Sequence, residues 1–445
     1  MRTRTVLAAS CSLPLAIGVI TAASAQEILR SSPAGSSQSL QPLRTGQEAP
    51  TARAETVVSR SRPELDPLGV RAGSFLIYPK LAVNQSYEDN IFAERAHVKG
   101  DFITDVKPSV AVESNWANHA LNVSSGADLG FYSTYTRQDY QDWFVKSDGR
   151  LDITRDSALF AGGGYAREHE EPGDPDAIAG AETPTEYDLI DGFVRHAQRF
   201  GRFRGIAEGQ VVRLDYLKVN TGDGPEQSTD DRDRTYYSGG YQLGYELFPQ
   251  YEVFVRANGN TRRYDKRTEV SATESYSRNS DGFTAVGGVS LDLGGLLFGD
   301  VYAGYMQQDF SHDFNDVSGP TAGGTLTYNV TTLTTLNARV ARTIEDTTQE
   351  DSPAVVRTSG GISADHELLR NLIVSSALTV THDAYADVTR DDYYYVAGLG
   401  AKYSMNRNLA GTFGYQFVRH TTGGSDTTDN SYYQNLIRIG LEAQL

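Results

Sequence analysis

The stretch that decides the fold reads Tyr237-Ser238-Gly239-Gly240-Tyr241-Gln242-Leu243-Gly244-Tyr245-Glu246-Leu247. Its large apolar side chains all occupy odd positions, whereas Ser, Gln and Glu occupy even positions. Successive side chains of a β-strand point to opposite faces of the sheet, so this alternation is typical of a strand with one apolar and one polar face. Residues 237–247 therefore predict a strand that separates an apolar environment from water.

The same alternation recurs from Gly73 to Leu445, in stretches of about 10 to 14 residues. The links between these stretches alternate in length as well. Short links such as Gly294-Gly295 alternate with long acidic links such as residues 168–186 and 218–234. Strands joined by short turns at one end and by long polar loops at the other are typical of outer-membrane β-barrels.

A bilayer offers no water to backbone N–H and C=O groups, so a sheet that crosses it must close on itself. We therefore predict an all-β protein, a transmembrane antiparallel up-and-down β-barrel of about 18 strands. A soluble propeller or tandem sandwiches would also give repeated alternation, but they would not require the alternation of loop length. Aromatic residues near the predicted strand ends are expected in the girdles of the barrel. They are Tyr87, Tyr132, Tyr140, Trp143, Tyr165, Tyr216, Tyr264, Tyr305 and Tyr385.

The composition excludes several classes of protein. The 445 residues include 40 Lys and Arg against 57 Asp and Glu, which gives a formal net charge of -17. The chain has no cluster of Lys and Arg that could neutralise the phosphates of a nucleic acid. Beyond the N-terminus, no apolar run approaches the roughly 18 to 20 residues of a membrane-spanning helix. We expect no nucleic-acid partner and no helical membrane domain.

The N-terminus has the pattern of a targeting signal. Arg2 and Arg4 precede an apolar stretch from Val6 to Ile20, and Ala23-Ser24-Ala25 follows it. A charged start, an apolar middle and a small-residue cleavage site are the features of a secretory signal peptide. The next stretch, rich in Ser, Pro and Gln, cannot bury enough apolar surface to offset its chain entropy. The expected domains are a signal peptide at residues 1–25, a disordered periplasmic leader at residues 26–70 and an outer-membrane β-barrel at residues 71–445.

The start of the predicted barrel resembles a known family. Residues 62–75 read Arg-Pro-Glu-Leu-Asp-Pro-Leu-Gly-Val-Arg-Ala-Gly-Ser-Phe, and residues 87–93 read Tyr-Glu-Asp-Asn-Ile-Phe-Ala. Together with Asp101-Phe102-Ile103 and Pro108-Ser109, they are similar to the opening of the putative beta-barrel porin 2 family of Gram-negative outer-membrane proteins. The resemblance covers residues 62–445. It implies a role in surface polysaccharide export or anchoring, because members of that family are often associated with exopolysaccharide, capsule or holdfast production.

Strand parity assigns the charged side chains that would line the lumen. The expected lumen-lining cations are Lys80, Lys107, Lys146, Arg150, Arg256, Arg262, Arg339, Arg357, Lys402 and Arg438. Arg213 follows from the same rule, although parity is ambiguous in residues 206–216. Acidic residues such as Asp105, Asp128 and Glu442 share this interior. A ring of one charge sign would indicate ion selectivity, whereas this mixture predicts a hydrated, internally salt-bridged wall.

The long loops carry much of the acidic excess, in runs that include residues 168–176 and 223–233. Hard cations prefer oxygen ligands, so such loops could share divalent ions with lipopolysaccharide phosphates. Neither run has the spaced Asp-x-Asp-x-Asp-Gly pattern of a calcium loop. We interpret both runs as solvated charge and expect no defined metal site.

No arrangement of residues indicates catalysis. The pairs His312-Asp313 and His382-Asp383 come nearest to it, but neighbouring strand residues point to opposite faces. The chain has no Gly-rich phosphate loop, no Cys/His metal spacing and no Gly-x-Ser-x-Gly elbow. We expect no enzymatic activity, no catalytic residues and no cofactor.

The expected function is that of a conduit or accessory for surface exopolysaccharide export. Two alternatives stay open: a general porin for small solutes, and a structural or adhesion barrel with a plugged lumen. The expected partners are outer-membrane lipid, lipopolysaccharide, the barrel-insertion machinery, and either a polysaccharide or small solutes. The expected location is the outer membrane of a Gram-negative cell.

Overall fold

The computed structural model describes residues 55–178, 181–221, 226–271, 274–311, 313–349, 351–425 and 430–445. The predicted signal peptide and residues 26–54 of the predicted leader lie outside these ranges. The elements are β1 (Val70–Ala72), β2 (Phe75–Glu88), β3 (Asp101–Ser114), β4 (Ala120–Tyr132), η1 (Thr136–Gln138), β5 (Tyr140–Thr154), β6 (Ser157–His169), β7 (Glu186–Phe200), β8 (Phe203–Tyr216), η2 (Asp230–Arg232), β9 (Arg234–Phe248), β10 (Tyr251–Tyr264), β11 (Thr268–Ser271), β12 (Glu274–Tyr276), β13 (Ser280–Asp292), β14 (Leu297–Phe310), β15 (Val317–Thr331), β16 (Thr334–Glu345), β17 (Val355–Leu369), β18 (Leu372–Tyr385), β19 (Asp391–Ser404), β20 (Leu409–Gly423) and β21 (Tyr432–Gln444). Within the described ranges, no helix has the length and apolar character needed to cross a membrane.

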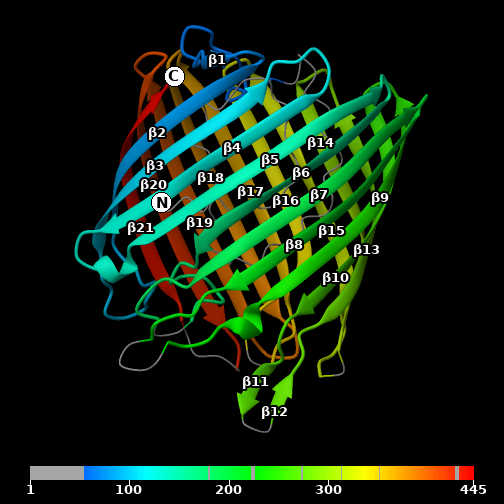
Figure 1. Cartoon of the computed structure of the whole chain (residues 1–445). Coiled ribbons are helices and arrows are strands. Elements are labelled where there is room, and N and C mark those ends of the chain that lie inside the picture. Colours follow the sequence, from blue (N-terminus) through cyan, green and yellow to red (C-terminus); the bar gives the residue numbers. More distant parts are fainter. Residues whose placement is uncertain are drawn as a thin grey trace.

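The strands β2 to β10 and β13 to β21 form a closed antiparallel barrel of 18 strands (Figure 1). Each strand pairs with its neighbours in the sequence, and β2 pairs with β21 from Lys80↔Gln444 to Glu88↔Leu436, which closes the sheet. Closure leaves no edge whose N–H and C=O groups would be unpaired in lipid. The predicted fold class and strand number are confirmed.

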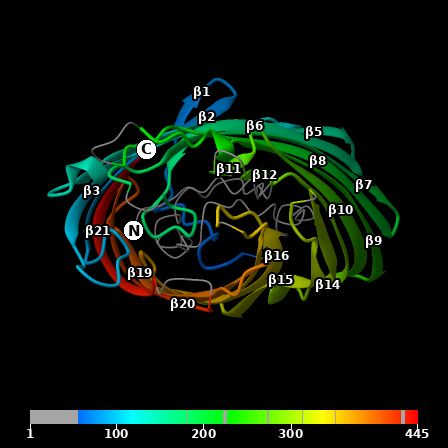
Figure 2. The same ribbon diagram turned by 90° about the horizontal axis from the view of Figure 1, so that it is seen from below.

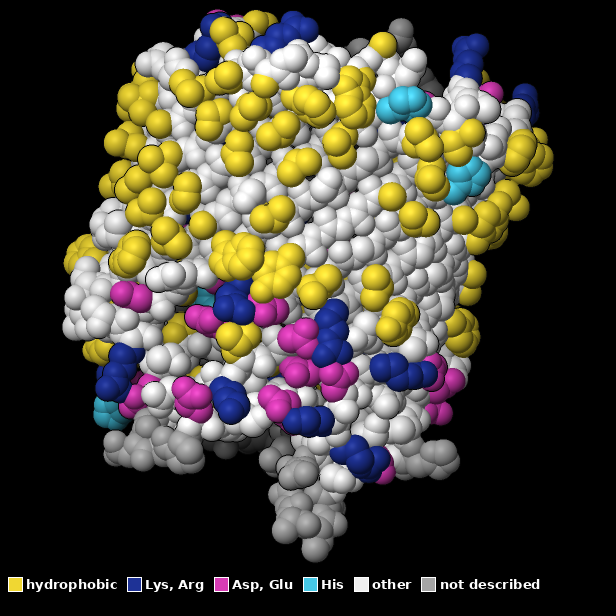
Figure 3. Space-filling view, in the orientation of Figure 1, with side chains coloured by type: hydrophobic (Ala, Val, Ile, Leu, Met, Phe, Trp, Pro, Cys, Tyr) yellow, Lys and Arg dark blue, Asp and Glu magenta, His cyan; other side chains and the backbone are white. Residues whose placement is uncertain are grey.

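Strand β2 shows how the alternation of side chains builds the wall. Leu81, Val83 and Tyr87 are 44%, 42% and 42% exposed, whereas Asn84 and Ser86 between them are 8% and 1% exposed. The apolar side chains therefore point outward and the polar ones inward, as a barrel in lipid requires. Figure 3 shows apolar side chains over the upper and middle wall, and Lys, Arg, Asp and Glu gathered at the lower end. The apolar band is the part of the wall that suits hydrocarbon.

Short turns join the strands at the upper end in Figure 1, and long loops join them at the lower end. The turn between β13 and β14 contains Gly294 and Gly295, whose φ angles are 63° and 79°. Glycine adopts these left-handed values without the strain that a Cβ would cause. The alternation of short and long links predicted from the sequence is confirmed. We call the two ends of the barrel the turn end and the loop end.

The aromatic residues near the strand ends divide into two groups. Tyr87 and Tyr305 are 42% and 46% exposed on the outer face, as a girdle requires. Tyr140 and Tyr216 are buried on the inward parity of their strands, where Tyr140 stacks on His169 with ring centroids 4.1 Å apart. These inward rings support the loops that fold over them instead of meeting lipid. The girdle expectation is wrong for Tyr132, Tyr140, Tyr216 and Tyr385, which are buried. It is also wrong for Tyr264, which shares the inward parity of Arg262 and lies against the buried Arg234.

Residues 55–69, which we call the turn-end segment, pack against the barrel. Val57 is buried, and its N–H donates to Thr335 Oγ1 (2.9 Å). Arg62 is also buried, and its Nη2 donates to Glu367 Oε2 (2.6 Å). Figure 2 shows this segment, in dark blue, inside the outline of the barrel. The structure thus corrects the expected disorder up to residue 70, because the segment finds partners on distant strands that no local pattern indicates.

Candidate functional site: the lumen and its mouth

The inner wall consists of polar side chains that pair across strands. Lys402 of β19 binds Glu442 of β21 (2.6 Å), and Lys80 of β2 lies 3.4 Å from the other carboxylate oxygen. Arg357 of β17 donates two hydrogen bonds to Asp383 of β18 (2.7 and 2.6 Å). Such charge-assisted pairs neutralise the wall locally. In the described strands, the wall therefore presents many hydrogen-bonding groups, and its charges do not form a ring of one sign.

The other expected lumen-lining cations also occupy inward-parity positions. Their partners include Asp128 for Lys107 (2.5 Å), Asp152 for Arg150 (3.0 Å), Gln242 for Arg256 (2.9 Å), Asp346 for Arg262 (2.6 Å) and Asp105 for Arg438 (3.4 Å). Lys146 lies over the Phe144 ring, 5.1 Å from its centroid. Arg339 is exposed, on the same parity of β16 as the buried Thr335. The structure therefore brings most of these cations into contact with a carboxylate or an aromatic ring.

Arg213 is the exception among the cations assigned to the lumen, because it lies on the outer face of β8. Leu214 and other apolar side chains of β8 pack inward, so sequence parity fails in this strand. Arg213 donates to Asp265 Oδ2 (2.6 Å) and also binds Asp215, and this hydrogen bonding lowers the pKa of Asp265. Carboxylate oxygens of Asp215, Asp233 and Asp265 lie within 4.8 Å of one another. Since Arg213 already supplies the positive charge there, we assign no metal site.

A buried carboxylate, Asp346, fastens the β16–β17 loop to strands farther round the barrel. Arg262 of β10 donates to its Oδ1 (2.6 Å), and Tyr236 of β9 donates to its Oδ2. Arg234 of β9 lies 3.4 Å from the same Oδ2. Burial alone would raise the pKa of Asp346, but Arg262 and Arg234 hold that pKa below its ordinary value. The carboxylate therefore stays ionised and fixes the loop across the lumen.

Two further contacts hold the β16–β17 loop inside the barrel. Asp176 of the β6–β7 loop accepts hydrogen bonds from the N–H of Thr348 (2.8 Å) and from the hydroxyls of Thr347 (3.1 Å) and Thr348 (3.0 Å). Arg278, between β12 and β13, donates to backbone carbonyls of the same loop. Figure 2 shows these loops crossing the interior when the barrel is viewed from the loop end. We call the contacts of Asp346, Asp176 and Arg278 the loop network.

The acidic run at residues 168–176 is not the solvated charge that the sequence predicts. Glu170 and Asp176 are 2% and 8% exposed. Glu170 accepts two hydrogen bonds from Arg232 of η2, one of them 3.0 Å long. Buried charges are stable only with such partners. The run is buried because its loop folds inward, toward cations that lie on other loops.

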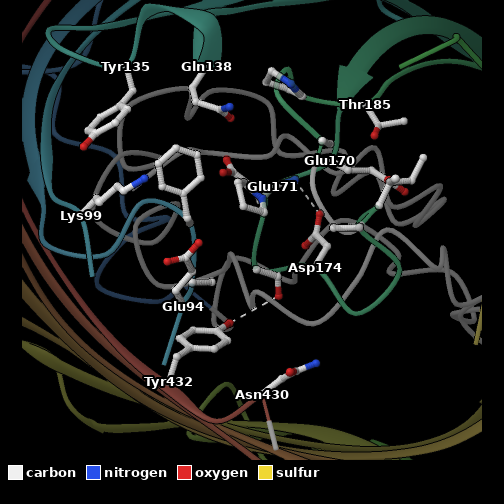
Figure 4. Close-up of a pocket in the computed structure, with 18 of the residues that line it drawn as sticks. Glu94, Lys99, Tyr135, Gln138, Glu170, Glu171, Asp174, Thr185, Asn430 and Tyr432 are labelled. Atoms are coloured by element: carbon white, nitrogen blue, oxygen red, sulfur yellow. Dashed lines mark hydrogen bonds between the residues drawn. The ribbon is translucent and has the colours of Figure 1, made fainter. Parts of the chain in front are cut away.

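A pocket of about 970 Å³ opens among the loops at the loop end (Figure 4). Phe92 and Tyr135 meet edge to face on one side of it, with centroids 5.3 Å apart. Lys99 Nζ lies 5.2 Å from the Phe92 centroid and 5.6 Å from the Tyr135 centroid. Glu94 and Glu171 also line the space. We call this space the mouth pocket.

Of the two histidine pairs considered in the sequence, only His382-Asp383 lies wholly within the described residues. His382 Nε2 lies 2.7 Å from Asp391, whereas Asp383 points inward to Arg357. The two members of that pair therefore face opposite sides of β18. His312 lies outside the described residues.

Sequence reasoning missed the contacts that hold a loop at the loop end and the turn-end segment at the turn end. Asp346 and Arg262 are 84 residues apart, and Arg62 and Glu367 are 305 residues apart. Each contact depends on how far a loop or segment reaches across the barrel. No spacing within the sequence encodes that reach. Strand parity marked Arg262 as a lumen cation, but it did not indicate Asp346 as its partner.

A family model described as putative beta-barrel porin 2 matches residues 62–445. No curated protein matches the chain. The chain aligns with the ferric enterobactin receptor PfeA of Pseudomonas aeruginosa at 8% identity, over 83% of this chain and 80% of that chain, with a TM-score of 0.46. It aligns with the alcaligin outer-membrane receptor FauA of Bordetella pertussis at 12% identity, over 87% and 77% of the two chains, with a TM-score of 0.40. The chain aligns with OccAB3 of Acinetobacter baumannii at 13% identity, over 84% of this chain and 100% of that chain, with a TM-score of 0.44.

Proposed function

We propose that this chain, which belongs to the putative beta-barrel porin 2 family and is a porin-like outer-membrane β-barrel, acts as a conduit or accessory for surface exopolysaccharide export. The observation that carries the proposal is the paired inner wall. Arg195 binds Glu208 (2.6 Å), Arg204 binds Glu252 (2.8 Å), and similar pairs recur around the barrel. A wall of this kind offers donors and acceptors to hydroxyl groups without the strong field of a single-sign ring.

A barrel plugged for a structural or adhesive role is the second candidate. The loop network and the turn-end segment favour it, because both place chain inside the barrel outline. The same contacts argue against a permanently open porin for small solutes. A conduit for polymer needs these contacts to open during export, whereas a structural barrel does not.

The proposal includes an export route and a lipid environment. We infer that residues 1–25 are removed on export, and sequencing of the N-terminus of protein purified from outer membranes should begin at Gln26. We infer that lipopolysaccharide head groups contact the partly exposed rim pairs Arg167–Asp188 (2.7 Å) and Arg263–Asp281 (2.7 Å), which lie near the loop ends of their strands.

Deletion of the gene, followed by an assay of surface polysaccharide, tests the proposal. We expect the amount of surface polysaccharide to fall and to recover when the wild-type chain is supplied again. An unchanged amount would overturn the export role. Single-channel recording in planar bilayers then separates the candidates, because a structural barrel should show no conductance at any voltage, even after the loop network is broken by substitution.

A further inference from the structure

We infer that the mouth pocket is a binding site for a neutral, hydroxyl-rich segment of glycan. This inference rests on the proposed function, and it names the place where the polymer is held at the loop end. The pocket volume of about 970 Å³ lies near the top of the roughly 300 to 1,000 Å³ that small-molecule sites occupy. It is therefore large enough for a segment of a polymer.

An aromatic platform forms one side of the pocket. Phe92 comes from the β2–β3 loop, and Tyr135 immediately precedes η1; both rings are partly exposed. The electron-rich face of an aromatic ring attracts the polarised C–H groups on one face of a sugar ring. The ammonium group of Lys99 lies over one face of each ring, so a sugar would pack next to it, where its N–H groups can donate to hydroxyls. Figure 4 shows Lys99 and Tyr135 at the same edge of the pocket.

Carboxylate acceptors stand near this platform, and one of them is held in place by buried structure. Glu94 is exposed, but its N–H donates to Asn90 Oδ1 (3.1 Å) and its carbonyl accepts from Asn90 Nδ2 (2.9 Å). Asn90 is fully buried and also donates to the carbonyl of Tyr433 (2.8 Å), on β21. The backbone of Glu94 is therefore fixed before any ligand arrives. A residue whose backbone is already ordered loses less conformational entropy on binding than one in a free loop.

The lining also selects against other classes of ligand. An apolar ligand would remove water from the charged groups of Lys99 and Glu94 without replacing the lost hydrogen bonds. The lining carries charges of both signs, from Glu94, Glu170, Glu171, Asp174 and Glu182 and from Arg95, Lys99, Arg137 and Arg390. This mixture gives no strong positive field that would attract a polyanion such as a uronate or phosphate polymer. A neutral polyol can accept from Lys99 and donate to the carboxylates at the same time. This combination points to neutral sugar units.

Calorimetric titration of the full chain in detergent tests the site. The probe is surface polysaccharide from the source cells, cut to oligosaccharides and separated by anion exchange into neutral and acidic fractions. We expect the neutral fraction to bind the wild type. Tyr135→Leu, Lys99→Met and Glu94→Gln should each weaken this binding roughly tenfold, which is typical of the loss of one central contact.

Matched substitutions control for general effects on charge and folding. Lys266→Met and Glu64→Gln remove the same groups from exposed ion pairs outside the pocket, with Asp230 and Arg370. Both should bind like the wild type, and all variants must show the heat-modifiable gel shift of a folded barrel. Absence of wild-type binding, binding of the acidic fraction alone, or equal weakening by the controls would each overturn the inference.

The failure of this inference can be told apart from the failure of the proposed function. If deletion lowers surface polysaccharide but the wild-type chain binds no oligosaccharide, the pocket assignment falls and the export role stands. If deletion leaves the polysaccharide unchanged, the export role falls whatever the titration shows.

Discussion

Each end of the barrel is held by one acid that several cations share, but the two clusters differ in how deeply the cations are buried. At the loop end, one buried acid, Asp346, serves two buried cations, Arg262 (2.6 Å) and Arg234 (3.4 Å). At the turn end, one acid, Glu367, has three cationic neighbours, of which Arg62 is the nearest (2.6 Å). Loss of Asp346 leaves two buried charges without their partner. Loss of Glu367 would leave only Arg62 deeply buried, because the side chains of Arg60 and Arg370 are 23% and 51% exposed. The loop end is therefore the more fragile of the two.

The largest effect is expected from Asp346→Ala. It leaves the guanidinium groups of Arg262 and Arg234 buried without their carboxylate, and breaking a buried ion pair in this way costs about 3–5 kcal/mol. We expect the free energy of unfolding in detergent to fall by that amount, with faster proteolysis of the loops. Urea unfolding followed by fluorescence gives the first quantity.

The matched control for this change is Asp281→Ala, at the rim pair with Arg263. Both partners are substantially exposed, at 59% and 43% of their side-chain surface. Exposed pairs contribute about 0–1 kcal/mol. Equal losses in the two variants would contradict the buried role of Asp346.

A smaller effect is expected from Arg62→Ala at the turn end. It removes a charged hydrogen bond, which contributes about 1.5–3 kcal/mol, but Glu367 keeps Arg60 (3.6 Å) and Arg370 (3.8 Å) nearby. We expect trypsin to cleave the turn-end segment more readily, while the loops stay protected. Arg370→Ala, whose main partner Glu64 is exposed, should leave the cleavage rate unchanged. Faster cleavage of the loops instead would show that the two ends are not independent.

The smallest effect is expected from acid. The pKa of Asp346 in the folded protein lies below its ordinary value of about 3.9. The contribution of Asp346 to the free energy of unfolding is therefore complete above the ordinary pKa, and it is lost as pH falls through the folded pKa. The difference in stability between the wild type and Asp346→Asn should therefore shrink as pH falls from 7 to about 3. Other carboxylates are common to both proteins and cancel in this difference. A difference that stays constant with pH would contradict the assignment.

The sequence predicted the strands of the wall well, but it did not predict the loops and segments that fold against the inside of the wall. Alternation such as that in residues 237–247 fixes which face of a strand meets lipid, because lipid rejects polar groups all along the strand. It failed for Arg213 and Tyr216 in β8, where apolar side chains face inward as well. In this strand, the polarity of the residues therefore does not show which face meets lipid and which faces the lumen.

The barrel and its strand number followed from the sequence by itself, through side-chain alternation and the alternating lengths of the links. Both signals are local, because the polarity of each side chain has to match the environment on its own side of the sheet. Only the tertiary structure decided that Glu170 and Asp176 in the run 168–176 are buried, that residues 55–69 pack against the barrel, and that a mouth pocket exists. These features depend on contacts between segments as far apart as Arg62 and Glu367. Such segments can contact one another only because the closed barrel brings distant loops together over a common lumen.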